Sequence, residues 1–251
     1  MRNTGLRLLA PAILAMIGQQ ASAQATQSRI LVEGNGSVLT PPDLASIAYT
    51  VRGEGHSSDD AVAALVATHK AIEAAMLVAA PASELRDGKL QVHVVRGSDC
   101  KAGDDDVPRL SIGPCAISGY IAELPETLVM SAVKDAGTVA GLIGRLKGES
   151  ARVTGYALSH PAVASRSALT KAIANARATA ETMAQAGSVK LGRIYSISNS
   201  FENSGADEIV VTSQRQVRAP AEIMPPPILV SLKPEPIETT ARVVVTYEIG
   251  G

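Results

Sequence analysis

Alanine recurs at every fourth position of one segment, and this pattern is the strongest constraint on how the chain can fold. The alanines are Ala168, Ala172, Ala176 and Ala180. Positions four apart lie on one face of an α-helix, so the segment predicts a helix with a ridge of methyl groups. Such a ridge lets a sheet or a second helix approach closely, and Gly187 is placed to end the helix. We interpret the ridge as core packing, with a cofactor groove as the alternative.

Alternation of apolar and polar residues predicts strands throughout the chain. The strand segments are 30–32, 45–51, 90–94, 117–130, 153–159, 193–198, 209–211 and 243–249. Pro125 interrupts the longest of them and favours an edge or a bulge there. Gly34-Asn35-Gly36 follows the first short strand and is interpreted as a turn.

Two further segments carry apolar residues at helical spacing. The first begins after Ser57, which can form a capping box with Asp60, and Pro81 stops it. The second can be capped by Asp135, and Gly148 occupies the position of a left-handed C-terminal residue. Each helix lies between predicted strands, which indicates two strand–helix–strand units. The expected fold is α+β, with antiparallel sheets and three helices packed against them.

The N-terminal residues predict export. Arg2 and Arg7 precede the apolar run 8–17, and Ala21-Ser22-Ala23 has the small-x-small pattern that a signal peptidase reads. We predict a signal peptide over 1–23, with cleavage between Ala23 and Gln24. An apolar run of about ten residues is too short for the roughly 20 that span a membrane. The mature chain is therefore expected in the periplasm without a membrane span.

Composition excludes several classes of function. Hydrophobic residues make up 46% of the chain, enough to build the core of one domain over 24–251. A net charge of −1 and an aromatic content of 2% supply neither the basic field nor the stacking surface that nucleic-acid binding needs. With no Trp and one Phe, the chain cannot build the aromatic girdles of an outer-membrane barrel.

Cys100 and Cys115 are the two cysteines, and they bracket an acidic, turn-rich stretch. In an oxidising compartment an even pair that closes a short loop indicates a disulfide. The chain-entropy model assigns such a bridge roughly 3 kcal/mol for a loop of about 15 residues. A redox-active pair, the alternative, usually has C-x-x-C spacing. The run Asp104–Asp106 lacks the spaced ligands of a calcium loop, so we assign no cation to it.

No residue pattern predicts catalysis, a metal or a cofactor. His56, His69, His93 and His160 form no i, i+4 pair and have no cysteine close by. His69 falls on the apolar face of the first helix and is interpreted as a core histidine with a backbone partner. A G-x-S-x-G elbow is absent, and 34–36 lacks the third glycine of a dinucleotide loop. We expect no enzymatic activity.

The stretch 221–236 is rich in proline yet carries apolar side chains. Proline removes backbone donors and favours extended, loop-like chain. The apolar residues need a surface to cover, either on the same chain or on a neighbouring subunit. The residues expected to mediate self-association are Ile223, Met224, Ile228, Leu229 and Val230. We therefore predict a homo-oligomer, with an envelope protein as a further partner.

Four segments together resemble the SIMPL-domain family, bacterial periplasmic immunogenic or outer-membrane-associated proteins. They are Ile30-x-Val32-x-Gly34-x-Gly36 with Pro42-Asp43, Ser118-Gly119-Tyr120-x-Ala122, the alanine-rich helix with 187–197, and Val243-x-Val245-x-Tyr247-x-Ile249. The resemblance implies an α+β fold, a periplasmic or envelope location that includes association with the outer membrane, and no established enzymatic activity. Some relatives form ring-like or channel-like oligomers, and others are linked to envelope or oxidative stress.

The sequence thus predicts an exported, non-enzymatic envelope protein with a structural or interaction role. The alternative is a binding module for a small apolar ligand or an envelope component. Such a ligand would occupy a groove between the alanine-rich helix and the sheet.

Overall fold

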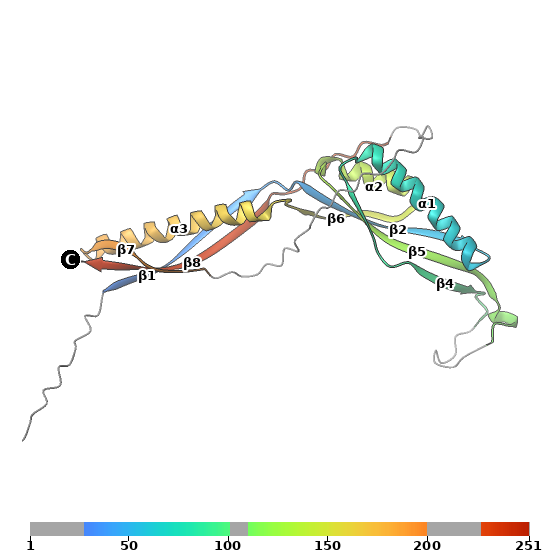
Figure 1. Cartoon of the computed structure of the whole chain (residues 1–251), viewed down its shortest axis with the longest axis horizontal. Helices are drawn as coiled ribbons and strands as arrows, with labels where there is room; N and C mark the ends of the chain where they lie inside the picture. Colours follow the sequence, from blue (N-terminus) through green and yellow to red (C-terminus); the bar gives the residue numbers. More distant parts are fainter. Residues whose placement is uncertain (1–27, 101–109, 200–226, 251) are drawn as a thin grey trace, which may run out of the picture.

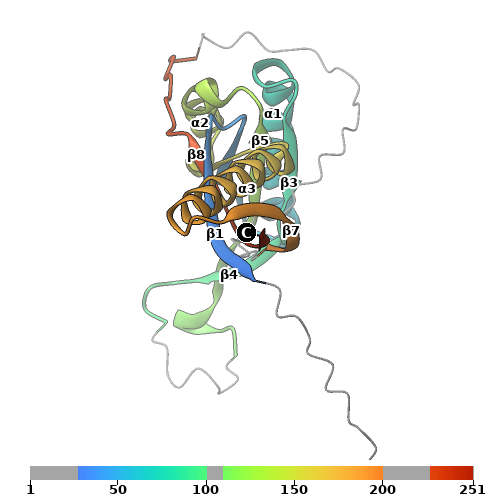
Figure 2. The same ribbon diagram turned by 90° about the vertical axis from the view of Figure 1, so that its left-hand side faces the viewer.

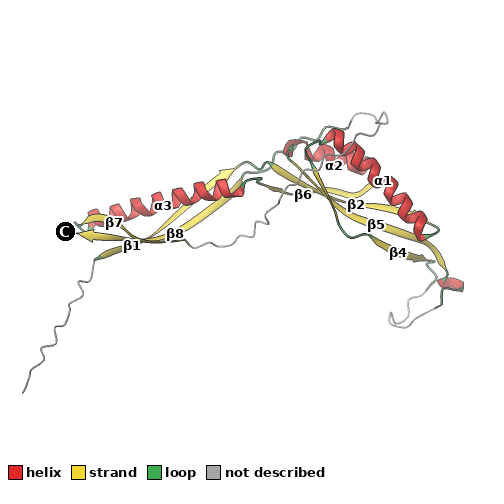
Figure 3. Cartoon of the chain, viewed as in Figure 1, coloured by secondary structure: helices red, strands yellow, loops and turns green. Residues whose placement is uncertain are grey.

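The computed structural model describes residues 28–100, 110–199 and 227–250. Two antiparallel sheets lie end to end in an elongated molecule, and each has its helices on one face (Figures 1 and 3). The two halves have separate hydrophobic cores with no residue in common. The expected α+β fold with three helices on antiparallel sheets is confirmed.

The smaller half is a three-stranded sheet covered by the alanine-rich helix. The strands run in the order β1 (Arg29–Thr40), β8 (Ile237–Gly250) and β7 (Lys190–Asn199), and the helix is α3 (Pro161–Ala186). Figure 2 shows the C-terminus between β1 and β7, as this order requires. The buried residues of α3 are Ala164, Ala168, Ala172, Ala176, Ala180 and Ala184. The ridge is therefore packed on the sheet, as predicted.

The interpretation of Gly34-Asn35-Gly36 as a turn is wrong. All three residues lie inside β1, where Gly34 is opposite Val243 of β8. A Cβ atom on Gly34 would lie 2.1 Å from the carbonyl oxygen of Ala172, and one on Gly36 would lie 2.3 Å from that of Ala168. The glycines are needed because the backbone of α3 approaches the backbone of β1 too closely for any side chain.

The larger half is a five-stranded sheet covered by two helices. The strand order is β3 (Glu84–Asp87), β5 (Ile117–Met130), β2 (Leu44–Gly55) and β6 (Gly148–Ala157), and β4 (Gln91–Arg96) also pairs with β5. Helices α1 (Ser58–Ala79) and α2 (Ala136–Arg145) pack on it, and the short 3₁₀ helices are η1 (Gly113–Cys115) and η2 (Val133–Asp135). The two predicted strand–helix–strand units interleave here in the split βαβ arrangement of ferredoxin-like folds.

The helix ends follow the sequence signals in part. The capping box of α1 is confirmed, since Ser57 Oγ accepts from the backbone N–H of Asp60 at 3.1 Å. After α2, however, Lys147 adopts the left-handed conformation with φ 69°. The prediction of Gly148 in that role is wrong. Gly148 begins β6, and a Cβ atom there would lie 2.4 Å from Cγ2 of Ile143.

Pro125 lies inside the sheet and not in an edge strand. β2 pairs with β5 on one side, and on the other side Pro125 faces the break between β3 and β4. The carbonyl of Pro125 accepts from the N–H of Gly88 at 2.7 Å. The missing proline donor is tolerated because, on the side of this break, neither β3 nor β4 pairs with β5 at Pro125.

Two of the connections between the halves are short and lie together. The chain passes from β1 to β2 through 41–43 and from β6 to α3 through 158–160. Asp43 links these connections, because its carboxylate accepts from the backbone N–H of Ser159 at 2.6 Å and from the hydroxyl of Ser159 at 2.5 Å. We call this pair the Asp43–Ser159 clamp.

Replacing Asp43 with alanine should destabilise the protein by about 1 kcal/mol at neutral pH, a modest value because the carboxylate is exposed. Burial alone would raise the pKa of Asp43, but the hydrogen bonds from Ser159 outweigh it and lower that pKa. The clamp therefore stabilises the fold above the unfolded pKa of about 3.9 and is lost as the pH falls through the folded pKa. Urea midpoints of wild type and variant should differ at neutral pH and converge as the pH falls through the folded pKa of Asp43. Equal midpoints at neutral pH would contradict the prediction.

Several predicted features lie outside the described residues. They are the cleavage site Ala23 and Gln24, the acidic run Asp104–Asp106, the strand 209–211, and Ile223 and Met224. Within the described part of the chain, α1 is the one helix long and apolar enough to cross a membrane. Core helices of soluble proteins meet the same criterion, and Leu65, Ile72 and Met76 of α1 are buried in the core.

Candidate functional site

A row of polar side chains crosses the five-stranded sheet beneath α1. Tyr49 of β2 lies directly opposite Glu126 of β5, and Glu126 lies directly opposite Asp87 of β3. Side chains directly opposite each other in antiparallel strands point to the same face of the sheet. Because α1 packs on β2 and β5, this face is the one that the helix covers. His69 of α1 reaches the row, with its Nδ1 2.6 Å from Oε1 of Glu126.

Glu126 is the unusual member of this row. The residue is 2% exposed, and within the described segments it is the one charged residue that is buried. His69 satisfies one carboxylate oxygen, whereas Oε2 of Glu126 and the hydroxyl of Tyr49 have no hydrogen-bond partner among the described residues. A buried carboxylate is costly unless it is paired and hydrogen-bonded. The row is therefore a site with unused binding capacity.

The hydroxyl of Tyr49 is held in its protonated form. Burial raises the pKa of Tyr49 first, and the facing Glu126 carboxylate raises that pKa further. The charges of Asp87 and Glu73 act in the same direction. The pKa of Tyr49 thus lies above its usual range, and the side chain keeps an O–H to donate at neutral pH.

The prediction for His69 is correct in its position and wrong in its partner. The side chain is 22% exposed on the sheet-facing side of α1, but it contacts a carboxylate and not a backbone group. The signal for Glu126 was its phase in β5, where the alternate positions Ala122, Leu128 and Met130 are buried. A charged residue in that phase marks a buried polar site.

The other three histidines lie elsewhere. His56, His93 and His160 are exposed. His93 has its Nε2 4.0 Å from an oxygen of Glu123 on the neighbouring strand. None of the three is in the group of His69, Asp87 and Glu126.

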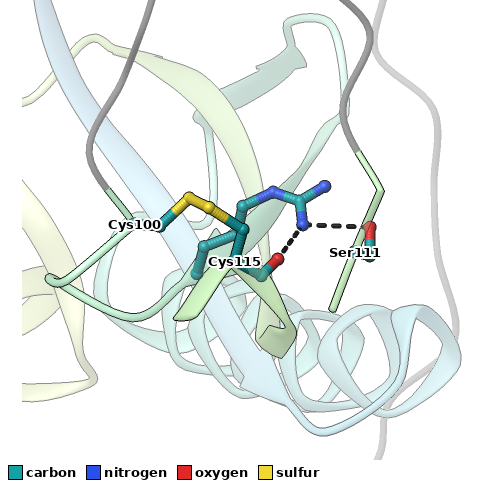
Figure 4. Close-up of a disulfide and its surroundings, with 4 residues drawn as sticks. Cys100, Ser111 and Cys115 are labelled. Atoms are coloured by element: carbon teal, nitrogen blue, oxygen red, sulfur yellow. Dashed lines mark hydrogen bonds between the residues drawn. A yellow bond between two sulfur atoms is a disulfide. The ribbon is translucent and has the colours of Figure 1, made fainter. Parts of the chain in front are cut away.

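Cys100 and Cys115 form the predicted disulfide (Figure 4). The bridge joins the residues after β4 to η1, which leads into β5. The guanidinium of Arg96 donates to the backbone carbonyl of Cys115 and, at 3.0 Å, to the hydroxyl of Ser111. The disulfide and Arg96 together close the far end of the β4–β5 hairpin.

The described part of the proline-rich stretch is fixed at one end and exposed at the other. Val230 exchanges hydrogen bonds with the Thr138 hydroxyl of α2, at 2.8 Å from its N–H and 3.3 Å to its carbonyl. Leu232 donates from its N–H to the carbonyl of Lys134 at 3.0 Å and packs against the larger core. The neighbouring Ile228 and Leu229 are 77% and 85% exposed. Of the three predicted contact residues that the structure describes, Ile228 and Leu229 are the most exposed, and Val230 is 42% exposed.

Comparison with known proteins gives one family. The model of the SIMPL family, described as a protein of unknown function (DUF541), matches residues 30–247 of the chain. This span includes every described strand and helix at least in part. A search of curated proteins gave no match.

Proposed function

The chain belongs to the SIMPL family, and from that premise we propose that it is an exported, non-catalytic protein of the bacterial envelope that self-associates. The observation that carries the proposal is the exposure of Ile228 and Leu229 beside the anchored Val230 and Leu232. Apolar side chains held outward at a fixed position are typical of an interface that another protein surface covers. We take a second copy of the same chain as that surface.

The disulfide supports the exported location. Bridges between cysteines form and persist in oxidising compartments such as the periplasm and are rare in the cytosol. The pair Cys100 and Cys115 uses both cysteines of the chain. Export is also what the N-terminal residues predict.

The close packing of α3 disfavours the alternative of an apolar ligand beneath this helix. Such a ligand needs a groove between the helix and the sheet. At Gly34 and Gly36 the two backbones approach so closely that even a methyl group would overlap the helix. The structure leaves no room for a ligand at these positions.

Replacing both Ile228 and Leu229 with serine should convert an oligomer into a smaller species. The exposed side chains carry few contacts within the chain, so the fold should persist while the interface loses apolar area. Light scattering coupled to size-exclusion chromatography over a concentration series measures the mass of both proteins. The matched control is the change of Leu110 and Ile112 to serine, two other exposed apolar residues.

Two results would count against this proposal. One is a wild-type chain that stays monomeric at every concentration. The other is equal loss of mass in the Leu110 and Ile112 control, which would assign the effect to general surface hydrophobicity.

A further inference from the structure

Three potential metal ligands converge between α1 and the five-stranded sheet. One donor atom from each of His69, Asp87 and Glu126 lies within 4.8 Å of the other two. Each comes from a different element: His69 from α1, Asp87 from β3 and Glu126 from β5. The sheet register fixes the two carboxylates opposite each other, and the packing of α1 adds the imidazole.

The contact with His69 satisfies only one of the two carboxylate oxygens of Glu126. The side chain of Glu126 is 0% exposed, and its Oε2 has no hydrogen-bond partner among the described residues. Asp87 brings a second carboxylate to the same place, so two acidic groups face one imidazole. The buried carboxylate of Glu126 is costly without a cation, and the exposed carboxylate of Asp87 adds negative charge beside it.

We propose that His69, Asp87 and Glu126 bind a divalent transition-metal cation, for which Zn²⁺ is the reference ion. Imidazole nitrogen and carboxylate oxygen are ligands that zinc and its neighbours in the first transition row accept. Three protein ligands leave a fourth position for water, as in open zinc sites. The cation would neutralise the two carboxylates and occupy the free lone pairs of Glu126.

The geometry requires only small movements. Zinc holds such ligands at about 2.0–2.2 Å, so that neighbouring ligand atoms are about 3.4 Å apart. The contact between His69 and Glu126 must open from 2.6 Å, and the widest separation must close from no more than 4.8 Å. Asp87 is exposed and His69 partly so, which provides a path from solvent to the buried Glu126.

Two side chains next to the three proposed ligands would support a bound cation. Glu73 follows His69 by four residues, so it projects from the same face of α1 and adds negative charge. The Tyr49 hydroxyl lies opposite Glu126 in the sheet and can donate to that carboxylate, as groups around metal ligands commonly do. The three ligands are far apart in the sequence, which is why their spacing predicted no site.

The test is a titration of the purified chain, stripped of metal with a chelator and with its disulfide intact, with Zn²⁺ by isothermal titration calorimetry. We expect one Zn²⁺ per chain. Asp87→Asn should weaken binding at least about tenfold. Because Asp87 is exposed, this variant should keep its fold, which circular dichroism verifies. The matched control is His93→Ala, an exposed histidine beside Glu123 and outside the cluster; this control should bind as tightly as the wild type.

A second experiment measures the thermal stability of the fold instead of the heat of binding. At one fixed zinc concentration, Zn²⁺ should raise the melting temperature of the wild type and of His93→Ala equally, and that of Asp87→Asn by less. X-ray absorption of the zinc complex should report one nitrogen ligand with oxygen ligands and no sulfur. Absence of stoichiometric binding, wild-type affinity in Asp87→Asn, or loss of binding in His93→Ala would each overturn the proposal.

Discussion

Replacing Gly34 with valine should unfold the three-stranded half of the molecule while the five-stranded half stays folded. A Cβ atom at this position would lie 2.1 Å from the Ala172 carbonyl oxygen and 2.6 Å from the Ala176 methyl group. Overpacking a core costs about 1–3 kcal/mol even where side chains can move aside. Here the obstacle is backbone, so we expect a loss at or above the upper end of that range.

The separation of the two cores makes this effect measurable in one half at a time. Because the cores share no residue, hydrogen exchange should accelerate in β1, β8 and α3 and remain slow in β2 and β5. The matched control is Gly155→Val in β6, where a Cβ atom would meet nothing within 4 Å. If the two valine variants unfold at the same urea concentration, the close approach of α3 is not what requires glycine.

Removing the disulfide by changing Cys100 and Cys115 to serine should cost about 3 kcal/mol, the chain-entropy value for a loop of about 15 residues. The bridge closes the far end of the β4–β5 hairpin, so the loss should be largest there. Urea unfolding of the oxidised wild type, the reduced wild type and the double variant measures it. The reduced wild type and the double variant should agree with each other.

Reductant serves as the internal control for this prediction. It should shift the unfolding midpoint of the wild type and have no effect on the serine variant, which has no cysteine left. A double variant as stable as the oxidised wild type would show that the hydrogen bonds of Arg96 hold the hairpin end without the bridge.

The elements of the fold were largely predictable because their signals are local. The alternation in 243–249 and the four-residue spacing of alanine in 168–180 depend on neighbouring residues alone, and both elements formed as predicted. A strand missed was β3, which has four residues and too short a run for alternation to register. Periodicity in the sequence identifies helices of several turns and long strands, but it does not detect an element as short as β3.

The meaning of a glycine depends on residues that are distant in the sequence. Gly34 and Gly36 are compatible both with a turn and with close packing, and the choice depends on Ala168 and Ala172, more than 130 residues later. The same device recurs at Gly53 of β2, where a Cβ atom would lie 2.1 Å from the Ala61 carbonyl oxygen of α1. Sequence patterns show that such a position is special without showing why.

The polar row was missed for a similar reason. Considered singly, Glu126 follows a proline and is typical of a surface residue, and His69 is typical of a core histidine. Their contact joins residues 57 positions apart and exists only once α1 covers the sheet. The phase of Glu126 among buried apolar positions of β5 was the available signal.

The strand order of the smaller sheet sets when that half can form during synthesis. β8, the last strand, lies between β1, the first, and β7. All the strands and helices of the larger half are complete by Ala157, so that half can fold as its residues emerge. The smaller sheet must wait for β8, because β1 and β7 pair with β8 and not with each other.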